Sequence, residues 1–133
     1  MEPQSLPFSI PKVYEGFATA HGIARMTPSG LTLEFEVKDG IVGMIKSGVR
    51  EVQIPIDDLH VLELRKGWLR TRLFIRTRRM TAVNRIPGNR AGMIELHVAR
   101  ADRQIAEALV SLVMLRLSER ELERLGSHPA FDA

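Results

Sequence analysis

The sequence predicts a mainly β fold, a bent antiparallel sheet or partly open barrel of about seven short strands, capped by one C-terminal α-helix. Apolar and polar residues alternate through much of the first hundred residues, the period of two expected of half-buried strands. Turn signals rich in proline and glycine separate these runs. After Asp102 the apolar spacing changes to three and four residues, which is the period of a helix.

Two predicted hairpins are the clearest of these elements. The first turns at residues 27–30, Thr-Pro-Ser-Gly, and continues into the alternating run 31–37. The second turns at Lys66-Gly67, after which we expect the inward residues Leu69, Leu73 and Ile75. Further strands are expected over residues 52–56, 80–86 and 93–99.

The chain of 133 residues is long enough for one core, and we expect one domain over residues 16–125. Pro3, Pro7 and Pro11 predict an extended N-terminal arm over residues 1–15. The glycines at 40, 43 and 48 predict a loop or bulged strand, and residues 126–133 a loose tail.

The chain contains no cysteine, so it has neither disulfides nor thiolate metal ligands, which fits a reducing compartment. Its N-terminus lacks a signal pattern, and no apolar run reaches the length of a membrane span. We therefore expect a cytoplasmic protein without integral membrane association.

Positive charge is segregated along the chain. Residues 1–63 carry five Lys/Arg against nine Asp/Glu, and residues 64–133 carry fourteen against seven. Between Arg65 and Arg90 there are nine basic residues and no carboxylate.

Strand alternation places part of this basic block on one surface, an arginine stripe formed by Arg70, Arg72, Phe74, Arg76 and Arg78. Arginine suits phosphate and carboxylate groups, and Phe74 could stack on a base. The stripe predicts an anionic partner, with nucleic acid as an alternative, unless Glu63 and neighbouring carboxylates balance it. Trp68, the single tryptophan, lies in the adjacent turn, where it either contacts a membrane or partner or folds back over the sheet.

The predicted helix is apolar around most of its circumference. Ile105, Leu109 and Leu112 are expected to plug the sheet. Four residues then point elsewhere and predict an interface with a second copy or another protein: Val110, Val113, Met114 and Leu117. Alternatively, the arm with Leu6, Phe8 and Ile10 covers them. Residues 118–121 resemble a capping box and predict a kink or second short helix.

No active-site pattern is present in the sequence. Among the four histidines, only His60, close to Asp57 and Asp58, belongs to a cluster of possible metal ligands, and that spacing is too loose to predict a metal. No nucleophile or phosphate-loop motif occurs. We expect a non-catalytic protein without metal or cofactor, and a small hydrolase is the remote alternative.

Two segments carry a family resemblance, residues 52–59 (VQIPIDDL) and 63–69 (ELRKGWL). They resemble the middle strands of bacterial pleckstrin-homology-like (PH-like) proteins of unknown function, over residues 16–117. The resemblance implies a strongly bent sheet plugged by the C-terminal helix, and an interaction module that binds a protein or anionic ligand. Phosphoinositide-binding members use basic residues of the first hairpin, but here that turn is short and has only Arg25 nearby. Inositol-phosphate binding at that usual place is not expected.

Overall fold

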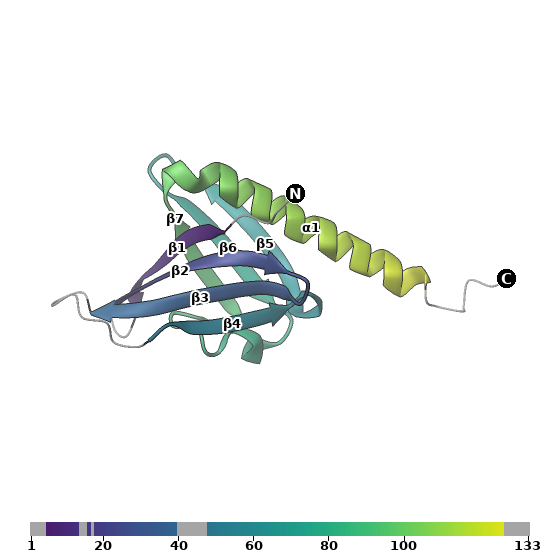
Figure 1. The fold of residues 1–133 in the computed structure, drawn as a ribbon, viewed down its shortest axis with the longest axis horizontal. Coiled ribbons are helices and arrows are strands. Elements are labelled where there is room, and N and C mark those ends of the chain that lie inside the picture. Colours follow the sequence, from purple (N-terminus) through teal and green to yellow (C-terminus); the bar gives the residue numbers. More distant parts are fainter. Residues whose placement is uncertain (1–4, 14–15, 17, 40–47, 127–133) are drawn as a thin grey trace.

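The computed structural model describes residues 5–13, 16, 18–39 and 48–126 of the chain. Within these described residues, seven antiparallel strands form one open, bent sheet, and a single long helix packs against it (Figure 1). The strand order is β4-β3-β2-β1-β7-β6-β5, so the first and last strands of the sequence are neighbours in the middle. The predicted fold class is confirmed, and its architecture is PH-like.

The strands follow one another closely along the chain: β1 (Leu6–Val13), β2 (Ala18–Thr27), β3 (Gly30–Asp39), β4 (Arg50–Pro55), β5 (Leu59–Lys66), β6 (Thr71–Thr77) and β7 (Met93–Val98). Three short 3-10 turns are η1 (Ile56–Asp58), η2 (Met80–Val83) and η3 (Arg100–Asp102). The helix α1 (Arg103–Gly126) follows η3 directly. Both predicted hairpin turns are confirmed, because β2 and β3 flank residues 28–29, and β5 and β6 flank residues 67–70.

The β2 strand presents small residues to the core, which makes room for two phenylalanines. Gly22 lies opposite Phe8 of β1 and Phe35 of β3 in the strand register. A Cβ atom at residue 22 would lie 2.0 Å from the carbonyl oxygen of Glu34, so only glycine fits there. Both phenylalanines are buried.

The expected N-terminal arm is extended over residues 6–13, as predicted. The prediction that these residues lie outside the domain is wrong. These residues form β1, which pairs with β2 on one side and β7 on the other. Leu6, Phe8 and Ile10 are buried core residues rather than a cover over the helix. Pro7 and Pro11 lie on either side of Ser9, and each lacks the backbone N–H that a strand donates to its neighbour. This fits the single Ser9–His97 register pair between β1 and β7.

The strand expected over residues 80–86 is also wrong, because this segment begins with the 3-10 turn η2. Its apolar residues Val83 and Ile86 are both completely buried, although they are three residues apart. A strand would place an odd spacing on opposite faces, whereas a tight turn brings residues three apart to one side. The glycine loop at 40–47 and the tail at 127–133 lie outside the described residues.

The helix α1 is continuous through residues 118–121, so the predicted kink is wrong. Its buried residues are Ala106, Leu109 and Val113, and four of its other apolar residues pack partly buried against the same core: Ile105, Val110, Leu112 and Leu117. Val113 is fully buried in the protomer, so its predicted place in a partner interface is wrong. Met114 is exposed.

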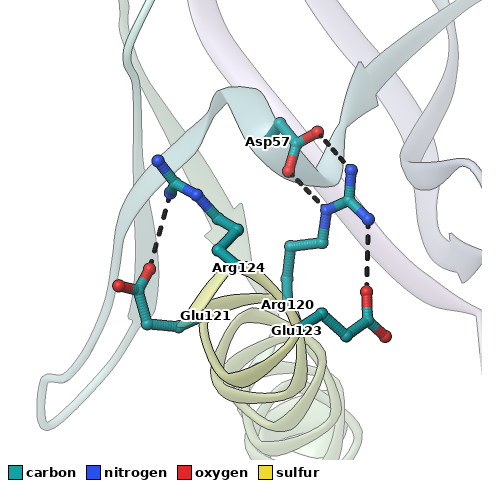
Figure 2. A network of polar contacts seen from close by, with 5 residues as sticks. All are labelled: Asp57, Arg120, Glu121, Glu123 and Arg124. Atoms are coloured by element: carbon teal, nitrogen blue, oxygen red, sulfur yellow. Dashed lines mark hydrogen bonds and ion pairs between the residues drawn. The ribbon is translucent and has the colours of Figure 1, made fainter. Parts of the chain in front are cut away.

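The C-terminal half of α1 is tied to the sheet by an ion-pair network (Figure 2). Arg120 donates to both carboxylate oxygens of Asp57 in η1, from Nε at 2.8 Å and from Nη2 at 3.0 Å. Within the helix, Arg120 also bonds Glu123 and Arg124 bonds Glu121. The bidentate geometry fixes the distance between η1 and this part of α1.

We expect truncation of Leu6 to destabilise the domain strongly. Leu6→Ala should lower the free energy of unfolding by about 2–5 kcal/mol, because Leu6 is fully buried in a strand paired on both sides. Urea denaturation measures this change. Ser9→Ala, on the other face of β1, is the control and should change stability by less than about 0.5 kcal/mol. Equal, small effects from both substitutions would mean that β1 behaves as a dispensable arm.

We also expect the anchoring of α1 to weaken in acid. The hydrogen bond from Arg120 lowers the pKa of Asp57 below its ordinary value of 3.8. The contribution of Asp57 to stability is therefore complete above 3.8 and is lost as the pH falls through the lower folded-state value. Asp57→Asn should slightly lower the melting temperature at neutral pH and flatten the decline in acid.

Glu121→Gln is the matched control for this experiment, because it removes an ion pair that lies within α1 alone. Thermal unfolding followed at several pH values compares the two variants. An acid decline of Asp57→Asn that matches the unmodified protein would exclude Asp57 as an anchor.

Candidate functional site

The predicted arginine stripe is only partly assembled on β6. Leu73 and Ile75 are buried, and Arg72, Phe74 and Arg76 lie on the opposite face, as the alternation predicts. Leu69 does not face inward, because Thr71 takes the first inward position of the strand and Leu69 is exposed in the turn. Arg70 lies in that turn, and Arg78 lies beyond the other end of β6.

Cross-strand contacts occupy the centre of the stripe. Arg72 Nη1 lies 3.2 Å from Glu95 Oε1 of β7, and Arg65 on β5 pairs with Glu63 at 3.0 Å. The Arg65 guanidinium also lies over the Phe74 ring, 4.2 Å from its centroid. Phe74 is therefore half-buried beneath Arg65, and an external base would have to displace that guanidinium to stack on it.

His97 of β7 lies beside these ion pairs, and its pKa depends on them and on its burial. Its Nε2 is 3.5 Å from Glu95 Oε1, and its Nδ1 is buried without a hydrogen-bond partner among the described residues. Burial lowers the pKa of His97 below 6.5, Glu95 opposes this shift, and Arg72 and Arg70 add to it. The imidazole is thus held in its neutral form.

The tip of the β5–β6 hairpin, residues 66–70, carries the most exposed aromatic side chain among the described residues. Trp68 is 84% exposed and Leu69 is 73% exposed, so Trp68 does not fold back over the sheet. Such consecutive exposed apolar side chains are costly in water unless something covers them. The sequence Lys66-Gly67-Trp68-Leu69-Arg70 carries a signal for this turn, but the predicted alternation starts the strand at Leu69, two residues before β6 begins.

The tip is held in a defined conformation. Gly67 N–H donates to the Arg70 carbonyl oxygen at 2.8 Å, and a Cβ at residue 67 would lie 2.6 Å from that oxygen. Arg103, at the start of α1, donates from Nη2 to the Gly67 carbonyl at 2.8 Å and from Nε to Thr71 Oγ1 at 2.9 Å. Sequence reasoning missed this role of Arg103, because the two residues it joins to α1 lie more than thirty positions earlier.

Basic side chains surround the apolar tip. Lys66 pairs with Glu107 of α1, and Arg65 pairs with Glu63. The guanidinium of Arg70 has no hydrogen-bond or ion-pair partner within residues 5–13, 16, 18–39 and 48–126. Trp68, Leu69 and Arg70 therefore present two apolar groups and one uncompensated cation at the same turn.

Arginines also line concave places elsewhere on the described surface. A groove of about 260 Å³ between η1 and α1 includes Arg78 and Arg120, but Asp57 and Glu121 line it too. A cavity of about 550 Å³ between β4 and the segment after η2 is lined by Arg50 and Arg85 together with Glu51. Carboxylates lie beside the arginines in both places.

The two carboxylates of the possible metal-ligand cluster Asp57, Asp58 and His60 are each paired with a different arginine. Asp57 binds Arg120, whereas Asp58 accepts two bonds from Arg79, at 2.9 and 2.6 Å. Within the described part of the chain, no three carboxylate or imidazole groups converge as a metal site.

Comparison with known proteins adds no relative from which a role could be transferred. No protein-family model, curated protein or solved structure matches this chain. Among the described residues, no helix has the length and apolar character needed to cross a membrane.

We expect His97 to titrate below 6.5 in NMR spectra, because burial disfavours its charged form. The folded state then loses stability as the pH falls from about 6.5 through this lower pKa, since only the unfolded chain takes up the proton readily. Glu95→Gln should lower the pKa further, because it removes the one opposing charge, whereas Arg72→Gln should raise it. A His97 pKa at or above 6.5 in the unmodified protein would contradict the buried, neutral imidazole.

Proposed function

We propose that the chain is a non-catalytic, PH-like interaction module that docks on anionic membrane surfaces through the tip of the β5–β6 hairpin. The observation that carries this proposal is the exposure of Trp68 and Leu69 on a turn braced by Arg103. Tryptophan favours the membrane–water interface because its ring is apolar and its N–H remains polar. A braced tip loses little conformational freedom when it binds.

The charge around the tip supports an anionic surface as the partner. Arg70 is uncompensated among the described residues, and Arg65, Lys66 and Arg103 lie at the base of the same turn. Anionic lipids attract basic side chains near the surface, and each charge contributes about a fivefold gain in affinity. Basic charge and apolar insertion together give a stable but reversible attachment.

Nucleic acid is less well supported as the partner. Phe74 would have to exchange its contact with Arg65 for a base, and Arg72 would have to leave Glu95. The PH-like assignment is supported by the strand order and the C-terminal helix, and a cytoplasmic location by the cysteine-free composition. The negative surface potential of the cytoplasmic leaflet fits the same partner.

The single tryptophan makes the proposal directly measurable, because all tryptophan fluorescence comes from the hairpin tip. Adding phosphatidylcholine vesicles that contain phosphatidylserine should shift the emission to shorter wavelength, and pure phosphatidylcholine should shift it much less. Raising the salt concentration should weaken binding, because exposed charges are screened. In vesicle co-sedimentation, Trp68→Ala should weaken binding about tenfold or more, and Arg70→Gln about fivefold.

Arg85→Gln is the matched control, since it removes one positive charge beside β4, beyond the end of β6 that is away from the tip, and should change binding little. If Arg85→Gln and Arg70→Gln weakened vesicle binding equally, binding would depend on the general positive charge of the protein and not on the hairpin tip. Absence of any emission shift with the anionic vesicles would overturn membrane docking. Salt-sensitive binding to single-stranded DNA or RNA, without vesicle binding, would establish the nucleic-acid alternative instead.

A further inference from the structure

The face of α1 turned away from the sheet carries a regular stripe of exposed residues. Ala106, Leu109 and Val113 are buried against the sheet. On the opposite side, successive spacings of four and three residues define an outer seam, and every member is exposed: Gln104, Ala108, Ser111, Leu115, Ser118, Leu122 and Leu125. These spacings are those of the a and d positions in a two-helix coiled coil.

The order of large and small residues along this outer seam indicates which partner fits it. Leucines lie toward the C-terminus, at 115, 122 and 125, and small residues lie mainly toward the N-terminus, at 108, 111 and 118. In an antiparallel pair of identical helices, centred between residues 116 and 117, Ala108 meets Leu125 of the second copy. Ser111 then meets Leu122, and Leu115 meets Ser118.

Each of the six layers generated by the two-fold axis therefore contains one leucine and one small side chain. Such layers have similar volumes, so two straight helices can approach evenly along their length. A parallel pair would instead place Leu115 against Leu115 of the second copy, Leu122 against Leu122, and Ser111 against Ser111. Large layers would then hold the helices apart and leave voids at the small ones.

The sheet leaves this seam accessible. It contacts α1 on the side of Ala106 and Val113, so a second helix on the outer seam lies on the far side of α1 from the first sheet. The C-terminal half of α1 also extends past the strands (Figure 1), and residues 120–126 are all exposed. Helical turns without tertiary packing are marginally stable, so pairing supplies contacts that the protomer lacks there.

Charges beside the seam do not oppose this pairing. Glu107, which would approach Glu121 of the second copy, is already paired with Lys66 of its own chain. Glu121 and Glu119 likewise have arginine partners within α1, Arg124 and Arg116. The seam is thus bordered by locally neutralised pairs rather than by bare like charges.

We propose that two copies of this chain associate through their α1 helices, antiparallel and two-fold symmetric, with Leu115 of each copy packed on Ser118 of the other. This self-complementary contact is isologous and closes at the dimer. Because Arg103 joins the start of α1 to the hairpin tip, the two helix starts lie about 40 Å apart in such a dimer, at a rise of about 1.5 Å per residue. Two separated tips would then act on one surface.

The first test is the mass in solution, measured by sedimentation or light scattering over a range of concentrations. The unmodified chain of 15.0 kDa should give a concentration-dependent dimer of 2 × 15.0 = 30 kDa. Leu122→Glu should weaken the dimer at least tenfold while the protomer stays folded, because Leu122 is 68% exposed there. Leu69→Glu is the matched control, an equally exposed leucine outside the seam, and should leave the dimer intact.

The second test fixes the register and direction and uses the absence of native cysteine. A tagged Leu115→Cys protein mixed with untagged Ser118→Cys protein should form mainly the mixed disulfide under mild oxidation. Predominant Leu115→Cys homodimers would instead indicate the parallel pair. That result, a monomer at all concentrations, or an unweakened dimer of folded Leu122→Glu would overturn the proposal. Vesicle binding by monomeric Leu122→Glu separates this outcome from the proposed function, since each tip remains.

Discussion

The pairing of β1 on both of its edges is the interaction on which the rest of this structure depends. It joins the β2–β3–β4 half of the sheet to the β5–β6–β7 half, because β4 and β5 lie at opposite edges of the sheet although only η1 separates them in the sequence. The bend between the two halves creates the concave side that the inner face of α1 fills. A chain without β1 would expose two apolar edges and lose the seat of the helix.

The apolar residues of α1 exceed what one contact can bury, and they lie on two sides of the helix. Leu109 and Val113 seal the core, whereas Leu115 and Leu122 face solvent. The Asp57–Arg120 pair holds the rotation of the helix, so the outward residues stay aligned as a seam. Stability of the protomer and the proposed self-association thus depend on the same helix orientation.

The charge pattern of the chain is resolved differently at the centre and at the tip of the β5–β6 hairpin. In the centre, Glu95 of β7 pairs with Arg72 of β6, and Glu63 pairs with Arg65 within β5. Both glutamates lie opposite Phe74 in the strand register. At the tip, residues 66–70 contain no carboxylate, and no carboxylate of the described residues pairs with Arg70. A run of basic residues in the sequence therefore forms a positively charged surface only where the fold places no carboxylate beside it.

The sequence by itself determined the elements with local causes: the alternation of β3 and of most of β6, the turns at 27–30 and at Lys66-Gly67, and a helix that begins after Asp102. Each depends on neighbours a few residues apart, and local chemistry specifies them. Tertiary structure alone decided the partners of β1, the ion pairs of the arginine stripe, the inward face of α1 and the exposure of Trp68. These depend on which distant segments meet, and a strand or an apolar helix with several suitable faces carries no local signal that selects among them.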